Sequence, residues 1–247
     1  LFDTEFIKPA MSLEDIVHGA EISGFAGLNI TYPYKVEIMD CLDELSDAAT
    51  AVGAVNTVVL RDGLRKGHNT DLWGFAESFR RNMADVPRDT VLLIGAGGAG
   101  AAVGHALAEC GAGRILIADS DRARAEALAV QIRERHGPEK AEAVNDLDTS
   151  AAVADGLVNA TPVGMSHLPG MPIAGELIRP DMWVADIVYF PLETELLAHA
   201  RQKGCRTLSG EGMAIFQAVR AFELFTGIQP DTDRMKAAFA AFDGGPP

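Results

Sequence analysis

A run of glycines follows a short apolar segment near the middle of the chain. Residues 91–94 are apolar, Gly95-Ala96-Gly97-Gly98-Ala99-Gly100 comes directly after them, and a helical stretch then leads to a second apolar run that ends at Asp119. In such a unit Gly95 allows a tight turn, Gly97 lets a diphosphate approach the backbone, and Gly100 lets the helix pack against the strand. The helix amino terminus adds free N–H groups. The pattern predicts a dinucleotide site, and a purely structural glycine turn is the alternative.

Asp119 indicates which dinucleotide is bound. A carboxylate at the tip of the second strand accepts hydrogen bonds from the ribose hydroxyls of NAD and repels the 2′-phosphate of NADP, so NAD is favoured. Arg122 and Arg124 follow closely and could neutralise that repulsion or stack on the adenine. For Arg122, a solvated surface charge is the favoured interpretation.

Polar side chains also gather at the ends of apolar segments in the first third of the chain. Asn29, Thr31 and Lys35 surround a proline that makes the chain turn. Asn56-Thr57 follows another small-residue segment, and Asn69-Thr70-Asp71 directly precedes an expected helix. Taken singly, Lys35 is a surface lysine, and Thr70 with Asp71 is an N-cap with a first-turn acid.

The elements that must position these residues form an α/β protein. Between about residues 90 and 209, β-branched runs alternate with helical patterns, as a doubly wound parallel sheet requires. Its later strands are expected at 141–144, 157–159, 183–187 and 206–208. A second α/β portion precedes it, with strands at 1–6 and 27–30 and a hairpin of 57–60 and 64–67 that turns at Asp62-Gly63. Helices expected at 71–83 and 213–225 flank the nucleotide segment, and the cleft should lie there.

Composition limits the class of protein. The 247 residues are 48% hydrophobic, which suffices for one large domain or two small ones. A net charge of −14 without a basic block argues against nucleic acid or an anionic membrane as partner. No apolar run is long enough to span a bilayer, and three dispersed cysteines indicate a reduced, cytoplasmic protein. The six histidines lack metal-site spacing, so no metal is predicted, and monomer and homodimer both remain open.

Seven motifs together resemble the shikimate dehydrogenase family. In chain order they are Asn29-Ile30-Thr31-x-Pro33-x-Lys35, Gly53-Ala54-Val55-Asn56-Thr57, Asn69-Thr70-Asp71-x-x-Gly74, the glycine run 95–100, Asn159-Ala160-Thr161-Pro162-x-Gly164-Met165, Asp186-x-x-Tyr189-x-Pro191 and Gly212-Met213-x-x-x-Gln217-Ala218. The resemblance covers nearly the whole chain. It implies two α/β domains with a cleft between them: a substrate domain of residues 1–73 with 213–247, and a Rossmann-type NAD-binding domain of residues 74–212.

The same resemblance implies roles for individual residues. Lys35 is the implied catalytic acid/base and Asp71 its partner. The residues implied to bind a cyclic polyol carboxylate are Thr31, Asn56, Thr57, Tyr189 and Gln217. Those implied to bind the dinucleotide are Gly95, Ala96, Gly97, Gly98, Ala99, Asp119, Arg124, Thr161 and Met213, the last packing near the nicotinamide. The implied reaction is the NAD-dependent interconversion of shikimate and 3-dehydroshikimate, and of quinate and 3-dehydroquinate.

Two features place the chain within the family. The NAD-dependent quinate/shikimate branch resembles this chain at Asp119-Ser120-Asp121 and at residues 189–197. The NADP branch usually has an Asn-Arg-Thr type segment where Asp119-Ser120-Asp121 stands. A biosynthetic NADP-dependent shikimate dehydrogenase and a non-catalytic dinucleotide-binding regulator remain the alternatives. The family's amino-terminal Ser-x-Ser/Thr pair, which binds the substrate carboxylate, would precede Leu1, so we expect a longer protein.

The chemistry of the implied reaction also constrains Lys35. Oxidation of a secondary alcohol needs a hydride acceptor and a base for the hydroxyl proton. Lys35 can be that base only if burial in a closed cleft disfavours its ammonium form. Asp71 favours the ammonium, so we expect it chiefly to orient Lys35 and to hydrogen-bond the substrate. Asn and Gln suit the other hydroxyls, because a carboxamide both donates and accepts.

Overall fold

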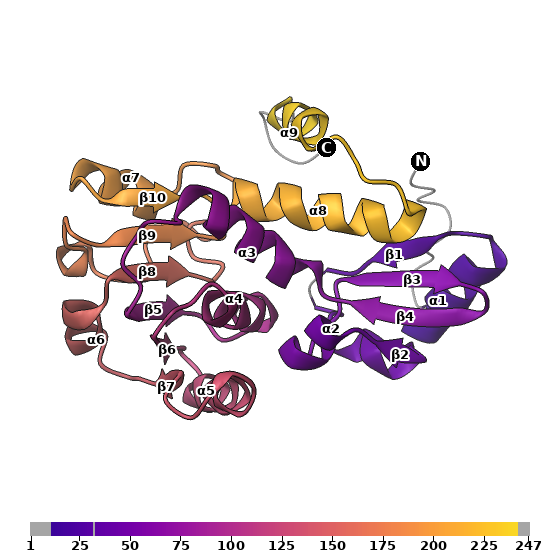
Figure 1. The fold of residues 1–247 in the computed structure, drawn as a ribbon, viewed down its shortest axis with the longest axis horizontal. Coiled ribbons are helices and arrows are strands. Elements are labelled where there is room, and N and C mark those ends of the chain that lie inside the picture. The colour runs from indigo at the N-terminus through magenta and orange to yellow at the C-terminus, as the bar shows by residue number, and fades with distance from the viewer. Residues whose placement is uncertain (1–10, 32, 242–247) are drawn as a thin grey trace.

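The computed structural model describes residues 11–31 and 33–241 and shows two α/β domains side by side (Figure 1). This arrangement confirms the predicted fold class. The strand expected at residues 1–6 lies outside the described residues. Within the described residues, no helix is both long enough and apolar enough to cross a membrane.

The N-terminal domain is built on a mixed sheet in the order β1-β3-β4-β2. Its elements are α1 (Leu13–Ile22), β1 (Gly27–Asn29), η1 (Glu37–Cys41), β2 (Glu44–Leu45), α2 (Asp47–Val52), β3 (Thr57–Arg61) and β4 (Leu64–His68). The predicted hairpin is confirmed, because Asp62 and Gly63 both have positive φ, 55° and 74°, as a tight β3–β4 turn requires. Val17 and Val58 meet in its small core.

The second domain is built on a parallel sheet in the order β10-β9-β8-β5-β6-β7. Its elements are β5 (Thr90–Ile94), α4 (Gly98–Glu109), β6 (Arg114–Ala118), α5 (Arg122–His136), β7 (Ala141–Ala143), α6 (Leu147–Val153), β8 (Gly156–Asn159), η2 (Gly175–Leu177), β9 (Trp183–Asp186), α7 (Glu195–Gln202) and β10 (Arg206–Leu208). The later strands lie within one residue of their predicted bounds. Strand order reverses between β5 and β8, which is where nucleotides bind in such sheets.

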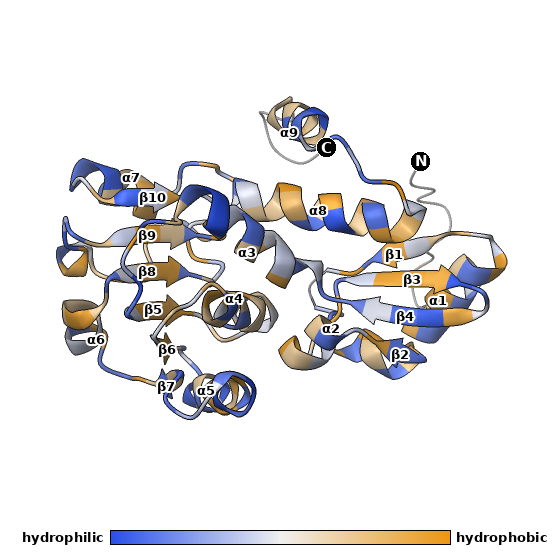
Figure 2. Cartoon of the chain, viewed as in Figure 1, coloured by the Kyte–Doolittle hydropathy of each residue, from blue (hydrophilic) through white to orange (hydrophobic). Residues whose placement is uncertain are grey.

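Both faces of the parallel sheet are covered. Successive side chains of β5 point to opposite faces, so Val91 and Leu93 pack with α3, α4 and α5, whereas Leu92 and Ile94 pack with α6 and α7. Figure 2 shows the hydrophobic strands β5 and β8 inside this layer and hydrophilic residues on the outer side of α5. The buried strands explain why their sequences read as continuous apolar runs.

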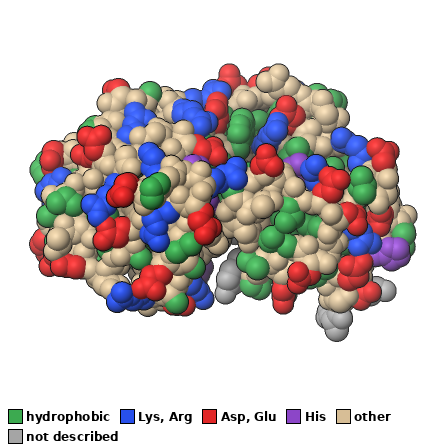
Figure 3. All heavy atoms as spheres, turned by 60° about the horizontal axis from the view of Figure 1, so that its bottom comes forward, with side chains coloured by type: hydrophobic (Ala, Val, Ile, Leu, Met, Phe, Trp, Pro, Cys, Tyr) green, Lys and Arg blue, Asp and Glu red, His purple; other side chains and the backbone are tan. Residues whose placement is uncertain are grey.

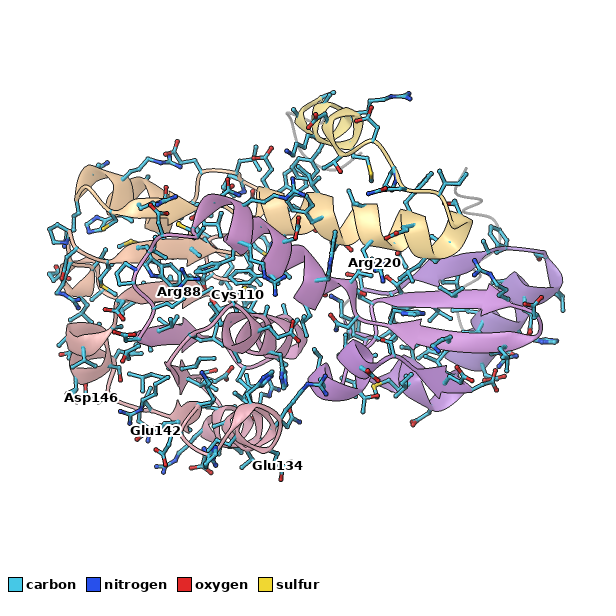
Figure 4. The ribbon with its side chains drawn as sticks, in the orientation of Figure 1. Arg88, Cys110, Glu134, Glu142, Asp146 and Arg220 are labelled. Atoms are coloured by element: carbon cyan, nitrogen blue, oxygen red, sulfur yellow. The ribbon has the colours of Figure 1, made fainter. Side chains whose placement is uncertain are left out.

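Two helices join the domains. Helices α3 (Thr70–Asn82) and α8 (Glu211–Thr226) lie side by side between the two sheets, and α9 (Thr232–Ala240) follows α8 (Figure 1). Gly74 permits this contact, because a Cβ there would lie 2.8 Å from the Met213 carbonyl oxygen. In the segment between α3 and β5, Arg88 donates to the Cys110 carbonyl at 3.0 Å and so ties this segment to the end of α4 (Figure 4). The predicted domain boundaries fall inside α3 and α8, and the division stays a prediction.

The surface carries many charged side chains. Figure 3 shows acidic and basic groups interspersed over one face of the molecule. Pairs such as Lys66–Glu44, with both partners about half exposed, are typical. Exposed pairs of this kind contribute about 0–1 kcal/mol each, so the fold depends chiefly on its apolar cores.

Candidate active site

Lys35 and Asp71 form an ion pair at the domain boundary. Lys35 lies in the turn that follows β1, and Asp71 is in the first turn of α3. The lysine Nζ donates to Asp71 Oδ2 at 2.6 Å, and the two side chains are 22% and 10% exposed. The Lys35 carbonyl also accepts a hydrogen bond from Val55 N–H at 2.7 Å, which fixes the lysine backbone beside Asn56.

Asn56 is held by the residue that precedes Asp71. Its Nδ2 donates to Thr70 Oγ1 at 3.0 Å, and its Oδ1 accepts from the Thr70 N–H at 2.8 Å. The Thr70 hydroxyl lies 3.5 Å from Gln217 Oε1 on α8. The N-cap interpretation of Thr70 is wrong: Asn69 is the N-cap, since its side chain accepts from Leu72 N–H at 3.1 Å.

Thr57 is placed differently from the other residues expected to bind substrate. Its side chain is fully buried and does not line the cavity described next. Its hydroxyl donates to Asn56 Oδ1 at 3.1 Å. Its hydroxyl also lies 3.4 Å from the Thr70 hydroxyl, which the Asn56 carboxamide contacts as well. Its place is behind Asn56, where it helps to orient the carboxamide.

A cavity of about 240 Å³ brings eight of the predicted site residues together. The predicted residues that line it are Thr31, Lys35, Asn56, Asp71, Tyr189, Met213, Gln217 and Ala99. Residues that sequence reasoning did not assign also line it: Asn29, Ile30, Ile187 and Ala214. Asn29 and Ile30 belong to a predicted motif, whereas Ile187 and Ala214 carry no chemical signal. The cavity therefore joins polar groups of the N-terminal domain to the first helix of the nucleotide unit.

The glycine turn has the geometry expected of a dinucleotide site. Gly95 has φ +106°, and a Cβ there would lie 2.7 Å from the Ala160 backbone. A Cβ at Gly100 would overlap with the Gly95 carbonyl, so α4 packs directly on the turn. In contrast, the space beside Gly97 is open within 4 Å, and Gly97 caps α4 without a side-chain hydrogen bond. The backbone at Gly97 and Gly98 thus leaves room and N–H donors for a diphosphate.

Asp119 makes contacts that the sequence did not reveal. Its Oδ2 accepts from the Ala96 N–H at 2.7 Å, and its Oδ1 accepts from Asp121 N–H at 2.8 Å. The carboxylate therefore fixes the glycine turn at the tip of β6. Arg122 pairs with Glu126 at 2.6 Å on the surface, as expected, and Arg124 lies 3.4 Å from Asp121 rather than pairing with Asp119.

A buried polar network supports the far wall of the site. Asn159 Oδ1 accepts from the Thr161 hydroxyl at 2.7 Å, and Asn159 Nδ2 donates to Asp186 Oδ1 at 2.9 Å. Asp186 Oδ2 accepts from the Thr194 hydroxyl at 2.7 Å. Burial raises the pKa of Asp186, and these hydrogen bonds oppose that rise. The network orients Thr161 and the segment that carries Tyr189. In the sequence, the feature that could indicate this network is the presence of polar residues at the ends of buried strands.

His68 lies close to Asp71 in the sequence but does not line the cavity. Burial, with Lys66 and Arg220 nearby, lowers the pKa of its ring. Arg220 lies on the side of α8 that faces the N-terminal sheet (Figure 4). Among the described residues, His, Cys, Asp and Glu side chains form no group of three or more that could hold a metal ion.

The fold and the cavity define a two-domain protein with a dinucleotide-type sheet and an acid–base pair at the domain boundary. Family models match along the chain: the shikimate dehydrogenase substrate binding domain at residues 3–58, shikimate / quinate 5-dehydrogenase at 77–166, and the shikimate 5′-dehydrogenase C-terminal domain at 210–238. The chain belongs to the shikimate dehydrogenase family, which confirms the resemblance seen in its motifs.

The names of individual relatives specify NADP in some cases and NAD in others. A shikimate dehydrogenase (NADP(+)) of Streptomyces avermitilis is 51% identical over 93% of this chain and 79% of its own length. A quinate/shikimate dehydrogenase (NAD(+)) of Corynebacterium efficiens is 47% identical over 92% of this chain and 81% of its own. The structure of quinate dehydrogenase from Corynebacterium glutamicum in complex with NAD superposes with a TM-score of 0.90 at 45% identity, covering 95% of this chain and 84% of that one.

Proposed function

We propose that the protein is an NAD-dependent oxidoreductase that interconverts shikimate and 3-dehydroshikimate, and also quinate and 3-dehydroquinate. The observation that carries the proposal is the Lys35–Asp71 pair, 2.6 Å apart, in a cavity that reaches Ala99 at the start of α4. The NAD-named relative and the NAD complex support the cofactor.

The residues of the glycine turn fit NAD. The open space beside Gly97, the uncapped amino terminus of α4 and the Asp119 carboxylate provide for the diphosphate and the ribose hydroxyls. When bound, NAD supplies the hydride acceptor at its nicotinamide. Met213, in the first turn of α8 and 8% exposed, lines the cavity and would pack beside the nicotinamide.

The remaining chemistry belongs to side chains of this protein. In the oxidation direction, Lys35 Nζ in its amine form takes the proton of the reacting hydroxyl, and in the reduction direction the ammonium returns it. Asp71 holds Nζ in place and accepts a hydrogen bond from the substrate. Asn56, Gln217, Thr31 and Tyr189 bind the other hydroxyls, and the bonds from Thr70 keep the Asn56 carboxamide oriented before substrate arrives.

The test is a set of initial rates with shikimate and with quinate, each against NAD and NADP. We expect NAD to give the higher kcat/KM, shikimate to exceed quinate, and quinate to stay above about a thousandth of shikimate. A preference for NADP would identify the biosynthetic NADP-linked activity. Dinucleotide binding without turnover of either substrate would identify a non-catalytic regulator.

A further inference from the structure

A second cavity, of about 480 Å³, lies further along α3 and on a different face of α8 from the active-site cavity. Ser78 and Arg81 of α3 and Gly212 and Phe216 of α8 belong to its wall, and α7 and α9 each add one basic side chain. Its volume is in the range of small-molecule sites. No step of the proposed reaction uses these residues.

The lining is cationic in a strongly acidic chain. Arg81, Arg201 and Lys236 line the cavity, against one carboxylate, that of Glu211, whereas the whole chain has a net charge of −14. Glu193, which pairs with Arg201, and Asp233, which lies 3.7 Å from Lys236, are 60% and 93% exposed and do not line it. The lining therefore carries more positive than negative charge, although each of its three cations also has a carboxylate partner outside the cavity.

Arg81 and Lys236 converge on one aromatic ring. The Arg81 Cζ lies 4.9 Å and the Lys236 Nζ 5.9 Å from the centre of the Phe216 ring. Arg81 is also paired with Glu77 at 2.6 Å, which fixes its guanidinium next to the ring. The Phe216 ring therefore contacts two cationic groups of the cavity, one from α3 and one from α9.

Ser78 adds a buried donor without a partner. Its residue is 1% exposed, and its Oγ has no hydrogen-bond partner among the described residues. The hydroxyl abuts Gly212, where any side chain would overlap with it. A buried hydroxyl that makes no hydrogen bond is destabilising, and such groups in native structures commonly mark an absent ligand or water.

The start of α8 supplies backbone donors at the same place. Gly210 caps this helix without a side-chain hydrogen bond, so its first N–H groups have no side-chain acceptor. We propose that the cavity binds a small molecule that carries a phosphate group. A phosphate offers several acceptor oxygens in a tetrahedral arrangement, which suits a guanidinium, an ammonium, a hydroxyl and a helix amino terminus together. The proposal is independent of the dehydrogenase activity.

The test is calorimetric titration of the full chain with inorganic phosphate, at constant ionic strength against sodium chloride. The key variant is Arg81→Gln, and the matched control is Arg80→Gln, an exposed arginine one position away that does not line the cavity. We expect Arg81→Gln to raise the phosphate Kd by about tenfold or more and Arg80→Gln to change it by less than about twofold. Lys236→Gln against Arg234→Gln repeats the comparison on α9 should Arg81→Gln fail to fold.

Ser78→Ala gives a second, independent readout. Because the hydroxyl has no protein partner, we expect Ser78→Ala to weaken phosphate binding without lowering the melting temperature of the phosphate-free protein. A merely structural serine would behave in the opposite way. Equal phosphate affinity in the wild type, Arg81→Gln and Arg80→Gln, no binding heat at millimolar phosphate, or displacement of the phosphate by NAD would each overturn the proposal.

Discussion

The Lys35 ammonium lies 2.6 Å from the Asp71 carboxylate, although the two residues come from different elements and are 36 positions apart. The adjacent residue, Thr70, holds Asn56 through its backbone and its hydroxyl. The first turn of α3 therefore orients both the acid–base residue and a substrate-binding carboxamide. The amino-terminal end of the helix dipole also stabilises the Asp71 carboxylate.

Replacing Lys35 should remove proton transfer and leave substrate binding largely intact. We expect Lys35→Ala to lower kcat by about 10²-fold or more with a small change in KM, because general acid–base catalysis contributes about 10²–10⁴-fold. The measurement is steady-state kinetics with shikimate and NAD. Lys66→Ala, which removes an exposed ion pair with Glu44 in the same domain, is the control. A kcat of Lys35→Ala within about threefold of wild type would exclude the assigned role.

Asp119 should be tested with two substitutions, because its carboxylate both carries charge and accepts the Ala96 N–H. Asp119→Asn keeps an oxygen for that N–H but loses the charge that repels a 2′-phosphate. We expect both Asp119→Asn and Asp119→Ala to lower the ratio of kcat/KM for NAD over NADP by about tenfold. Asp119→Ala should lower the melting temperature more than Asp119→Asn, because alanine removes both acceptors whereas asparagine loses only the acceptor for the Asp121 N–H. An unchanged ratio in Asp119→Asn would place cofactor discrimination elsewhere.

Thr57 should act on substrate binding through Asn56. Thr57→Val keeps the shape but removes the hydroxyl that donates to Asn56 Oδ1 at 3.1 Å. The lost hydrogen bond contributes about 1 kcal/mol to holding the Asn56 carboxamide in place. Its loss should raise KM for shikimate about threefold to tenfold, with a smaller effect on kcat. Thr57→Ser, which retains the hydroxyl, should restore KM to within about twofold of wild type. Equal KM values for Thr57→Val and Thr57→Ser would refute this positioning role.

Much of the fold was predictable because its signals are local. The apolar runs of β5 and β6, the glycines between them and the Asp62-Gly63 turn each follow from the backbone geometry they require. The candidate residues were found as motif members, and the cavity brings eight of the sixteen together. Local pattern could not tell Asn56 from Thr57, because which of two adjacent polar side chains reaches a cavity depends on the packing of both domains.

The supporting hydrogen bonds were also beyond local pattern. Asp119 contacts Ala96 across 23 positions, and Asn159 contacts Asp186 across 27. These contacts follow from the adjacency of β5 with β6 and of β8 with β9, which a linear sequence does not contain. The sequence predicts the cap of α3 one residue too late, at Thr70 instead of Asn69, because Asn69, Thr70 and Asp71 are all competent N-cap residues.

A histidine pair should make stability depend on pH. His105 on α4 is buried, its Nδ1 lies 3.0 Å from His136 Nε2, and burial, with His136 and Arg135 nearby, lowers the pKa of His105 from 6.5 to about 4. The unfolded chain therefore binds the proton first. The free energy of unfolding that depends on His105 is therefore greatest above about pH 6.5 and falls as the pH is lowered toward 4.

The measurement is urea unfolding of wild type and His105→Gln. Between about pH 7.5 and about pH 5, we expect the wild type to lose roughly 2 kcal/mol more than His105→Gln does. His167→Gln, at an exposed position, should keep the wild-type pH dependence. The same loss of stability in His105→Gln as in the wild type would remove His105 as its source.

Alanine at Gly100 should chiefly lower stability, whereas alanine at Gly97 should chiefly weaken NAD binding. A Cβ at Gly100 would overlap with the Gly95 carbonyl, whereas nothing lies within 4 Å of one at Gly97. Alanine within a helix normally stabilises a protein by about 1 kcal/mol relative to glycine. Because of the overlap, we expect Gly100→Ala instead to lower the free energy of unfolding by more than about 2 kcal/mol. Gly97→Ala should cost at most about 1 kcal/mol of stability, the difference between glycine and alanine at an N-cap.

The Cβ of Gly97→Ala would instead occupy the space open to the diphosphate, and we expect the Kd for NAD to rise by about tenfold or more. Urea unfolding and NAD titration of both variants make the comparison. Unchanged NAD affinity in Gly97→Ala would mean that the diphosphate does not lie against this turn.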